Sequence, residues 1–306
     1  MLTDLTSSHD QGIPVDPADA TIITVAFNSE AVLPAMLASK PKSTPAIVVD
    51  NASSDPIAIP KIAKNAPRTS VHRNDRNFGF GVGCNIGAQA VKTPYILFLN
   101  PDASLQEGAI EALLLAARKH PQAAAFNPRI FSDSGKLILK RRSQLLPRRE
   151  WHSRNWPDGD CVLPVLYGAA VFISKQNFDR VGGFDPAIFL YHEDDDISLR
   201  LRREVGELML ASDAKVQHLK GRSLSRSPET AAFKAFYMGR SRVYTRAKHG
   251  FSSPFFSSLA AAVAQLMSPD TLLSKRKRSK RMGFVKGVFS TWRDSGASGR
   301  SNTGTD

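Results

Sequence analysis

The sequence predicts an α/β protein with a doubly wound, mixed but mainly parallel sheet flanked by helices and a helical extension at the C-terminus. The unbroken apolar run at 95–99 and the mainly apolar segments 21–27 and 46–50 have the pattern of buried strands. Each run is followed by a polar turn and then by a segment with helical periodicity. Because strands and helices alternate, right-handed crossovers would place these strands side by side in one sheet.

Composition sets the class of protein. The chain has 306 residues, and its 42% hydrophobic content is enough to fill a core of that size. Its two cysteines, Cys84 and Cys161, are too few for a disulfide framework or a thiolate metal cluster, which fits a reducing compartment. Residues 1–20 lack an apolar core segment, so we expect a mobile tail rather than a targeting peptide. The net charge of +13 indicates an anionic partner: phosphate groups, nucleic acid or an acidic membrane surface.

The first half of the sheet is predicted from its strand ends. The strand at 21–27 is followed by a turn and a short helix from Glu30 to Ser39. The strand at 46–50 ends on Asp50, and the polar turn after it leads to a short helix at 57–66 and a third strand at 69–73. A carboxylate therefore stands at the carboxyl end of the second strand.

A glycine-rich segment, 74–87, comes next and opens a helix that runs to about Lys92. Its glycines resemble a dinucleotide-binding loop, in which backbone amides approach a diphosphate. That fingerprint requires an acidic residue at the end of the following strand, and this strand ends in Asn100 instead. Two interpretations remain: a loop that covers a nucleotide, and glycines that let the helix pack closely on the sheet.

The strand at 95–99 stops at Asn100-Pro101-Asp102. Proline cannot donate to a sheet ladder, so the carboxylate of Asp102 emerges just past the end of the strand, where open α/β sheets bind ligands. By itself the residue could equally be a structural turn aspartate. Ser104 and Glu107 have the spacing of a capping box and predict the start of a helix that continues from 109 to 120.

The middle of the chain predicts strands at 123–131, 137–139 and 166–173, with a hairpin turn at 132–136. Ser174 should cap a short helix, and 181–185 should form a turn. Residues 140–162 are irregular, basic and aromatic. They suit either a lid that faces an acceptor or a solvated surface excursion.

A second acidic centre lies at Glu193-Asp194-Asp195-Asp196, at the start of a predicted helix. A helix dipole stabilises one or two anions there, and four exceed what capping needs. Their mutual repulsion raises some pKa values unless a cation offsets it, which favours a functional site. Short strands are predicted at 208–211 and 214–218, the second of which ends at His218.

The C-terminal part reads as helical and basic. A helix is expected at 230–249, and the apolar segment 255–267 is too short to span a bilayer. Residues 275–281 hold six cations, and apolar residues then recur at helical spacing to Trp292. This pattern favours an anchor, 255–293, on an anionic membrane surface. Nucleic-acid binding is the rival but would require a folded, basic and aromatic reading surface, so we expect no nucleic-acid partner.

Together these motifs resemble the family-2 glycosyltransferases of the GT-A (Rossmann-like) fold, especially the bacterial rhamnosyltransferase-like members. They fall in the family's order and cover about residues 20–250. The matching segments are Thr24–Ser29, Val49–Asp55, Asn77–Asn85, Leu99–Ala103, the Gly168-Ala-Ala motif, Val181–Asp185, Glu193–Asp196 and His218–Ser223.

The resemblance implies roles for individual residues. Asp194 matches the catalytic base, with Glu193 beside it as a second catalytic residue. Asp102 and His218 match ligands of Mg²⁺ or Mn²⁺, although Asn100 replaces the first carboxylate of the usual Asp-x-Asp element. Asp196 and Trp156 are expected to contact the acceptor. For Glu193 and Asp196 the alternative is that they hold the start of the helix. The residues assigned to nucleotide-sugar binding are Ala26, Asn28, Asp50, Asn77, Gly79, Gly81, Asn85, Asn100 and Asp102.

The implied activity is an inverting, metal-dependent transfer of rhamnose or another hexose from a nucleotide diphosphate sugar. The acceptor would be lipid-linked or a polysaccharide, in cell-surface polysaccharide synthesis. We expect residues 21–250 to form the transferase domain and 251–306 a basic amphipathic tail, which would hold the protein peripherally on the cytoplasmic face of the cell membrane. The alternative is a protein that keeps the fold without catalysis and binds a membrane surface or nucleic acid.

Overall fold

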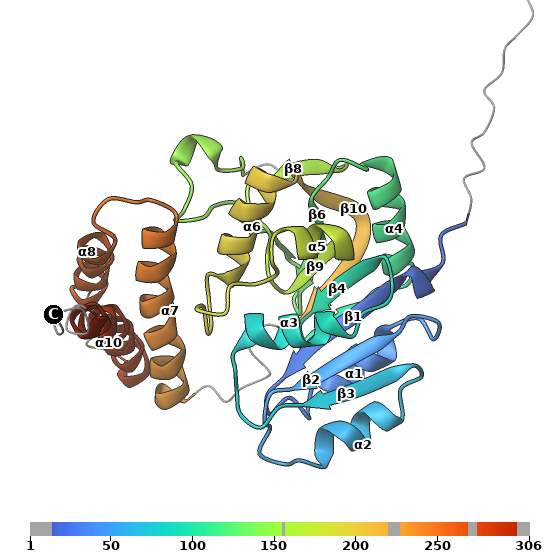
Figure 1. The fold of residues 1–306 in the computed structure, drawn as a ribbon, viewed down its shortest axis with the longest axis horizontal. Coiled ribbons are helices and arrows are strands. Elements are labelled where there is room, and N and C mark those ends of the chain that lie inside the picture. The colour runs from blue at the N-terminus through green and yellow to red at the C-terminus, as the bar shows by residue number, and fades with distance from the viewer. Residues whose placement is uncertain (1–13, 155–156, 220–226, 269–273, 299–306) are drawn as a thin grey trace, which may run out of the picture.

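Strands and helices alternate along most of the chain (Figure 1). The computed structural model describes residues 14–154, 157–219, 227–268 and 274–298. The strands are β1 (Ala20–Ala26), β2 (Ala46–Asp50), β3 (Thr69–Arg73), β4 (Tyr95–Leu99), β5 (Ala103–Leu105), β6 (Ala125–Ser132), β7 (Leu137–Ile138), β8 (Cys161–Leu163), β9 (Ala170–Ser174) and β10 (Leu208–His218). The helices are α1 (Leu33–Ser39), α2 (Ala58–Lys64), α3 (Phe80–Gln89), α4 (Ala109–Lys119), α5 (Lys175–Arg180), α6 (Glu193–Glu204), α7 (Pro228–Lys248), α8 (Pro254–Leu266) and α10 (Lys275–Ser298).

All ten strands belong to one mixed sheet, whose main path runs β3-β2-β1-β4-β9-β6-β10-β5. The first four strands of this path are parallel, as the sequence predicts. β9 runs antiparallel between β4 and β6, and β10 is parallel to β6. The parallel strands therefore share one carboxyl edge, and that edge carries most of the predicted site.

The core lies on both faces of the sheet. One cluster of buried side chains packs α1 and α4 against it, with Leu33, Leu97 and Leu113 fully buried. The other packs α3, α5 and α6 against the opposite face, around Phe98 and Phe184. Apolar strands covered on both faces confirm the predicted α/β class.

Four local predictions differ from the structure. Ser104 does not cap a helix, because its strand, β5, pairs with β10, and α4 begins later, after Gly108. The two strands expected at 208–218 form one strand, β10, which has an irregularity between Ala211 and Lys215. The strand expected at 166–173 begins only at Ala170. Part of the expected N-terminal tail is structured, since 17–19 form a 3₁₀ turn and β1 begins at Ala20.

The three C-terminal helices pack together at one side of the sheet (Figure 1). Phe284 and Val288 of α10 are buried in a cluster with residues of α7 and α8. The backbones come very close, because a Cβ added to Gly287 would lie 1.9 Å from the Phe236 carbonyl oxygen of α7. α10 therefore packs on α7 across the predicted boundary at residue 250. Among the described residues, no helix is both long enough and apolar enough to cross a bilayer.

Candidate active site

The carboxyl edge of the parallel strands collects the predicted nucleotide-sugar residues. Asp50 ends β2 beside Ala26, which ends β1 and is fully buried. Asn100 and Asp102 follow β4, the other neighbour of β1. Two strand spacings separate the ends of β2 and β4, about 10 Å. The edge therefore offers polar groups over a length that suits an extended ligand.

Asp50 is buried and held by two partners. Its Oδ1 accepts a hydrogen bond from the Ser53 amide at 2.9 Å, and its Oδ2 pairs with the Arg73 guanidinium. Arg73 also donates to the Ser53 carbonyl at 2.9 Å. These contacts fix the loop after β2, so that Asp50 is a preorganised acceptor at one end of the edge.

Asn28 and Asn77 shape the loops around this acceptor. The Asn28 side-chain oxygen accepts from the Ser54 amide at 2.7 Å, and the residue has a left-handed φ of 50°. The Asn77 oxygen accepts from the Gly79 amide at 2.9 Å. The side-chain oxygens of Asn28 and Asn77 therefore hold these loops, and their expected contacts with a nucleotide sugar stay predictions.

The glycines of α3 pack the helix against its neighbours. Gly79 has a φ of 85°, and a Cβ there would lie 2.1 Å from the Phe189 carbonyl oxygen. A Cβ on Gly81 would lie 2.9 Å from the Phe184 Cβ, and one on Gly83 2.8 Å from Val25. Of the two interpretations left open, close packing is the one that these contacts support, and nucleotide binding by Gly79 and Gly81 stays a prediction.

Asn85 also differs from its predicted role. Its amide nitrogen donates to the Phe184 carbonyl at 2.7 Å, and its oxygen accepts from the Phe184 amide at 2.9 Å. The side chain thus clamps the turn at 181–185 onto α3. These two hydrogen bonds give Asn85 a structural role, and its expected contact with the nucleotide stays a prediction.

Asp102 and His218 meet beside the end of β4, although 116 positions separate them in the chain. The His218 Nε2 lies 3.1 Å from the Asp102 Oδ1, and both side chains are nearly buried. Pairing of β10 with β5 produces this contact, because His218 lies directly opposite Ala103. The Tyr167 hydroxyl is 3.4 Å from the other ring nitrogen of His218.

This pair fits two ligands of one metal ion. Adjacent ligands of an octahedral ion at about 2.1 Å stand about 3 Å apart, which matches the separation of the Asp102 oxygen and the His218 nitrogen. No group of three acidic, histidine or cysteine side chains within the described ranges could hold a metal ion alone. An ion at this position would therefore need oxygen ligands from a bound diphosphate as well.

Asp194 lies in the first turn of α6 and is held by three donors. Its Oδ2 accepts from the Gly168 amide at 3.1 Å and pairs with the Lys140 ammonium at 2.8 Å. Its Oδ1 accepts from the Asp195 amide at 2.9 Å. Gly168 leaves the space for this approach, because a Cβ there would lie 3.3 Å from the Asp194 Cβ.

The Tyr167–Gly168 peptide connects the two acidic centres. Tyr167 reaches His218, while the next amide donates to Asp194. Asn127 of β6 holds this turn by accepting from the Tyr167 amide at 2.7 Å. Burial, and next the charges of Asp194 and Asp102, raise the pKa of Tyr167. Asp102, His218 and Asp194 therefore border one space.

Glu193 has an unusual environment. Burial, and next the charge of Asp194, raise its pKa to about 8. Its Oε2 is buried without a hydrogen-bond partner among the described residues. The side chain lies near Gly81 and Cys84 of α3. Near neutral pH a substantial share of Glu193 is therefore protonated, and a protonated carboxyl can donate a hydrogen bond.

Asp196 does not face the space that Asp194 borders. Its carboxylate is fully buried between α6 and α7, where it pairs with Arg200 at 2.8 Å, Lys248 at 2.7 Å and His249 at 2.9 Å. Burial alone would raise the pKa of Asp196, but these partners lower it to about 2. Residues two apart on a helix point to different sides, so Asp196 joins α6 to α7, and its expected contact with an acceptor stays a prediction.

Sequence reasoning missed Lys140, Tyr167 and His192. His192 lies 3.0 Å from Asp195 and has a left-handed φ of 70° that starts α6. Tyr167 is adjacent to the Gly168 motif, so position could have indicated it. Lys140 is one of 41 basic residues, and nothing in the sequence distinguishes it. Trp156, the other expected acceptor residue, lies outside the described residues.

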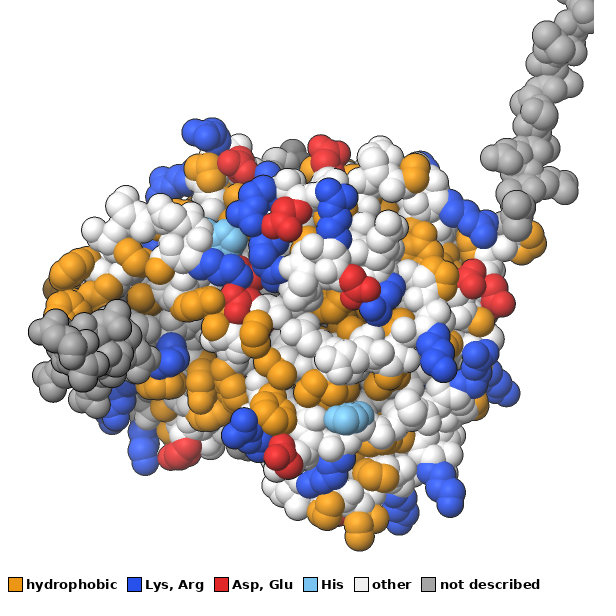
Figure 2. All heavy atoms as spheres, viewed as in Figure 1, with side chains coloured by type: hydrophobic (Ala, Val, Ile, Leu, Met, Phe, Trp, Pro, Cys, Tyr) orange, Lys and Arg blue, Asp and Glu red, His pale blue; other side chains and the backbone are white. Residues whose placement is uncertain are grey.

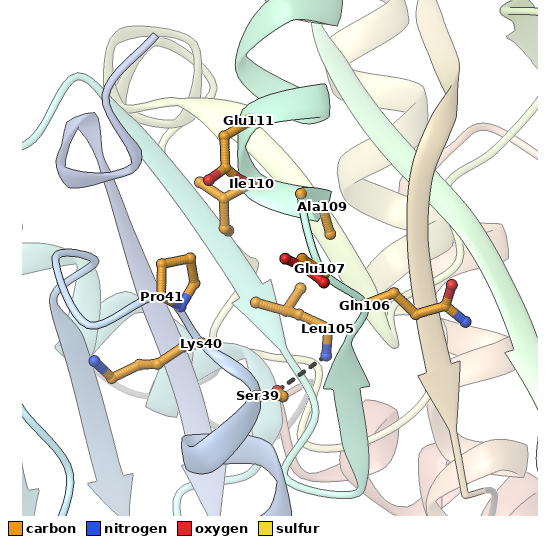
Figure 3. A pocket seen from close by; sticks show the side chains of 10 residues that line it. Ser39, Lys40, Pro41, Leu105, Gln106, Glu107, Ala109, Ile110 and Glu111 are labelled. Carbon is orange, nitrogen blue, oxygen red and sulfur yellow. Dashed lines mark hydrogen bonds between the residues drawn. The ribbon is translucent and has the colours of Figure 1, made fainter.

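A separate pocket lies on another part of the molecule (Figure 3). It lies between the end of α1 and the start of α4, and the Ser39 hydroxyl accepts from the Leu105 amide across it at 3.0 Å. The Lys40 ammonium beside it already donates to the carbonyls of Thr44 and Pro67. None of the predicted site residues lines this pocket, so it is distinct from the site at the sheet edge.

Comparison with solved structures identifies the fold. Mannosyltransferase PcManGT from Pyrobaculum calidifontis, in complex with GDP-Man and Mn²⁺, superimposes with a TM-score of 0.56 at 15% identity, covering 93% of this chain and 90% of that one. TarS 1–349 from S. aureus, in complex with UDP-GlcNAc, gives a TM-score of 0.52 at 14% identity, covering 90% and 92%. The chain has the GT-A glycosyltransferase fold, as the resemblance implied.

Sequence comparison identifies the family. N-acetylglucosaminyl-diphospho-decaprenol L-rhamnosyltransferase from Mycobacterium tuberculosis is 25% identical over 276 residues, covering 79% of this chain and 88% of the relative. The family model of glycosyl transferase family 2 matches residues 21–182, more than half of the chain. That range contains the strand ends that carry Asp50 and Asp102. The protein belongs to glycosyl transferase family 2.

Proposed function

We propose that this protein transfers a sugar, with inversion, from a nucleoside diphosphate sugar to a hydroxyl of a lipid-linked or polysaccharide acceptor. One observation carries the proposal: Asp194 and the Asp102–His218 pair meet across a single peptide at the carboxyl edge of the sheet. A base for an acceptor hydroxyl and a binding place for a diphosphate are thus adjacent. Asp50 lies farther along the same edge, where the nucleoside base would bind.

The proposed step is a displacement at the anomeric carbon. The acceptor O–H donates to Asp194, and the acceptor oxygen forms a bond to that carbon as the bond to the diphosphate oxygen breaks. The proton passes to Asp194, and the electron pair leaves with the diphosphate. Attack from the side opposite the leaving group inverts the anomeric centre. A hydroxyl is a poor nucleophile until its proton is removed, which is why the step needs a base within hydrogen-bond reach.

Asp102 and His218 would hold Mg²⁺ or Mn²⁺ together with the diphosphate oxygens. When bound, such an ion neutralises the charge that develops on the departing diphosphate. The mannosyltransferase and a GalNAc-T7 structure of the same fold contain Mn²⁺, which supports this choice. Asp102 also orients the imidazole of His218, because the two side chains lie within hydrogen-bond distance of each other.

We infer the chemical classes of the donor and the acceptor from the names of the relatives. The mycobacterial relative is named for transfer of L-rhamnose to N-acetylglucosaminyl-diphospho-decaprenol, a lipid-linked acceptor. Structural neighbours were solved with GDP-Man and UDP-GlcNAc. We propose a nucleoside diphosphate hexose or deoxyhexose such as rhamnose as donor and a lipid-linked glycan as acceptor, in cell-surface polysaccharide synthesis.

A panel of nucleotide sugars tests the proposal. With Mn²⁺ present, one UDP-, dTDP- or GDP-sugar should raise the melting temperature by several degrees, because a ligand at about 100 times its Kd adds about 2.7 kcal/mol of stability. The same sugar should be hydrolysed slowly without acceptor. If no donor in the panel stabilises the protein or is hydrolysed, the protein is a binding protein that has kept the fold.

We also propose that α8 and α10 rest on an anionic membrane surface. The apolar side of α10 that faces α7 is already buried, so the surface available to lipid is a different one. Side chains of both helices remain exposed there, and Figure 2 shows hydrophobic side chains gathered over α8. Phe255 joins the two helices through contacts with Phe289 and Trp292. The exposed hydrophobic residues are Phe256, Val263, Met267, Phe289 and Trp292.

Charge reversal tests the membrane proposal without disturbing the packing of α10. Lys275, Arg278 and Lys280 are exposed at its start, and changing all three to Glu should abolish sedimentation with vesicles that contain anionic lipid. Each basic residue near such a surface is worth about 1 kcal/mol, so three reversals should lower the partition constant more than a hundredfold.

A matched control changes the net charge by the same amount on another surface. The exposed residues Lys42, Lys61 and Lys64 lie around α1 and α2, away from the C-terminal helices (Figure 1). Their change to Glu should leave sedimentation largely intact. Equal losses in the two triple variants would mean that overall charge, and not this surface, attracts the protein to the vesicles.

A further inference from the structure

Lys140 places a cation between two carboxylates of the acidic helix start. Its Nζ lies 2.8 Å from the Asp194 Oδ2 and 2.9 Å from the Asp195 Oδ1. The ammonium supplies the offsetting charge that four successive carboxylates require. Burial lowers the pKa of Lys140, but the charges of Asp194 and Asp195 outweigh burial and raise it, so the side chain stays protonated.

The fold fixes the segment that presents Lys140. The side-chain amide of Gln144 lies 3.2 Å from the His192 ring at the start of α6. Arg246 of α7 donates to the Gln144 carbonyl at 3.2 Å. His192 also pairs with Asp195, the second carboxylate that Lys140 contacts. The segment that carries Lys140 is therefore held against α6 and α7 at Gln144.

The contacts of Asp194 leave room for one more donor. A carboxylate has about four lone-pair sites. The Gly168 amide, the Lys140 ammonium and the Asp195 amide occupy three of them, and only one of the three is on Oδ1. The remaining site on Oδ1 is available to an acceptor O–H.

We propose that Lys140 is a positioning residue for the transfer reaction: its ammonium fixes the orientation of the Asp194 carboxylate and keeps it negatively charged, so that Oδ1 receives the acceptor proton. This inference rests on the proposed function of Asp194 as the base. Within the described part of the chain, the ion pairs of Lys140 are with Asp194 and Asp195 and not with Asp102 or Asp50, so Lys140 would act through Asp194. Donor binding should therefore not depend on it.

The variant Lys140→Met tests the inference. Three other titratable groups face Asp194: Asp195 and Glu193 on α6, and Tyr167 at the turn before β9. None of them is a cation, so removal of the ammonium would leave the Asp194 carboxylate without the counter-charge that it now has 2.8 Å away. We expect the acidic limb of the kcat profile to move to higher pH by about one unit, so that kcat falls by up to about tenfold below the limb and changes little well above it.

Two further variants separate charge from structure. Lys140→Arg keeps the cation and should restore most of the acidic limb. The exposed Lys136, in the preceding hairpin, provides the matched control, and Lys136→Met should leave the profile in place. The Kd for the nucleotide should stay within twofold in all three variants. A lower kcat in Lys140→Met with an unmoved acidic limb would show a merely structural role and overturn the inference.

A measurement that needs no turnover separates this inference from the proposed function. The carboxyl carbons of ¹³C-labelled aspartate can be titrated by NMR, and loss of a signal in Asp194→Asn assigns Asp194. That signal should titrate at least about one pH unit higher in Lys140→Met than in the unmodified protein. If it does not move, Lys140 does not control Asp194, whether or not the protein transfers a sugar. If it moves but no nucleotide sugar is turned over, only the proposed function fails.

Discussion

Replacing Asp194 by Asn should reduce sugar transfer by about 10³-fold, because a general base contributes between about 10² and 10⁴ to the rate. The amide is almost isosteric, and its oxygen can still accept from the Gly168 or Asp195 amide. It cannot take the acceptor proton. Initial rates with a donor found in the panel would measure the loss, and calorimetric titration should give a nucleotide Kd within a few-fold of the original.

The exposed Asp133, in the hairpin between β6 and β7, offers a control with the same chemical change. Asp133→Asn should retain full activity. Transfer by Asp194→Asn within tenfold of the original rate would assign the base elsewhere. Loss of nucleotide binding together with transfer would mean that Asp194 holds the donor.

Replacing Asp102 by Asn should lower kcat/KM by at least about 10²-fold and abolish the response to Mn²⁺. Asp102 is the only carboxylate of the Asn100-Pro101-Asp102 turn, and its oxygen is the one that His218 contacts. A neutral amide binds a divalent ion weakly, since hard cations prefer charged oxygen ligands. The measurement is a titration of transfer rate, and of donor-induced thermal stabilisation, against Mn²⁺ and Mg²⁺.

Asp213 is an exposed aspartate on the same strand as His218, so Asp213→Asn controls for a change in charge near β10. It should leave the metal titration unchanged. If Asp102→Asn still responds to Mn²⁺ with the original half-point, the ion, if one is used, binds elsewhere and the Asp102–His218 pair is structural.

The hydrophobic pattern predicts the strands of the parallel half of the sheet, because each of these strands is marked by its own run of apolar residues. β2 and β3 match their expected bounds, and the polar residues after each strand follow from where the apolar run stops. The capping-box prediction at Ser104 fails because a distant strand overrides a local preference. The backbone of β5 pairs with β10, and the Leu105 amide donates a hydrogen bond to the Ser39 hydroxyl. Neither partner is visible from residues 104–107.

The position of a site residue could be predicted where the end of a strand determines it. It could not be predicted where the packing of distant segments determines it. Asp50 and Asp102 follow from strand ends, and the contact of Asp102 with His218 agrees with the resemblance. In the acidic run the sequence does not give the direction of each side chain. The helix turns Asp196 toward α7 and Asp194 toward Gly168. Lys140 is beyond sequence reasoning, because its place depends on contacts with α6 and α7.

The packing of α10 on α7 has a mechanical consequence. Glycines at the contact let the backbones of the two helices touch without side chains between them. At its C-terminal end α7 is joined to α6, because Lys248 and the following His249 pair with Asp196. A bilayer in contact with α8 and α10 would thus be connected to α6 by stiff helices. The height of the proton acceptor above the lipid headgroups would then be nearly constant, and with it the reach of the enzyme along a lipid-linked glycan.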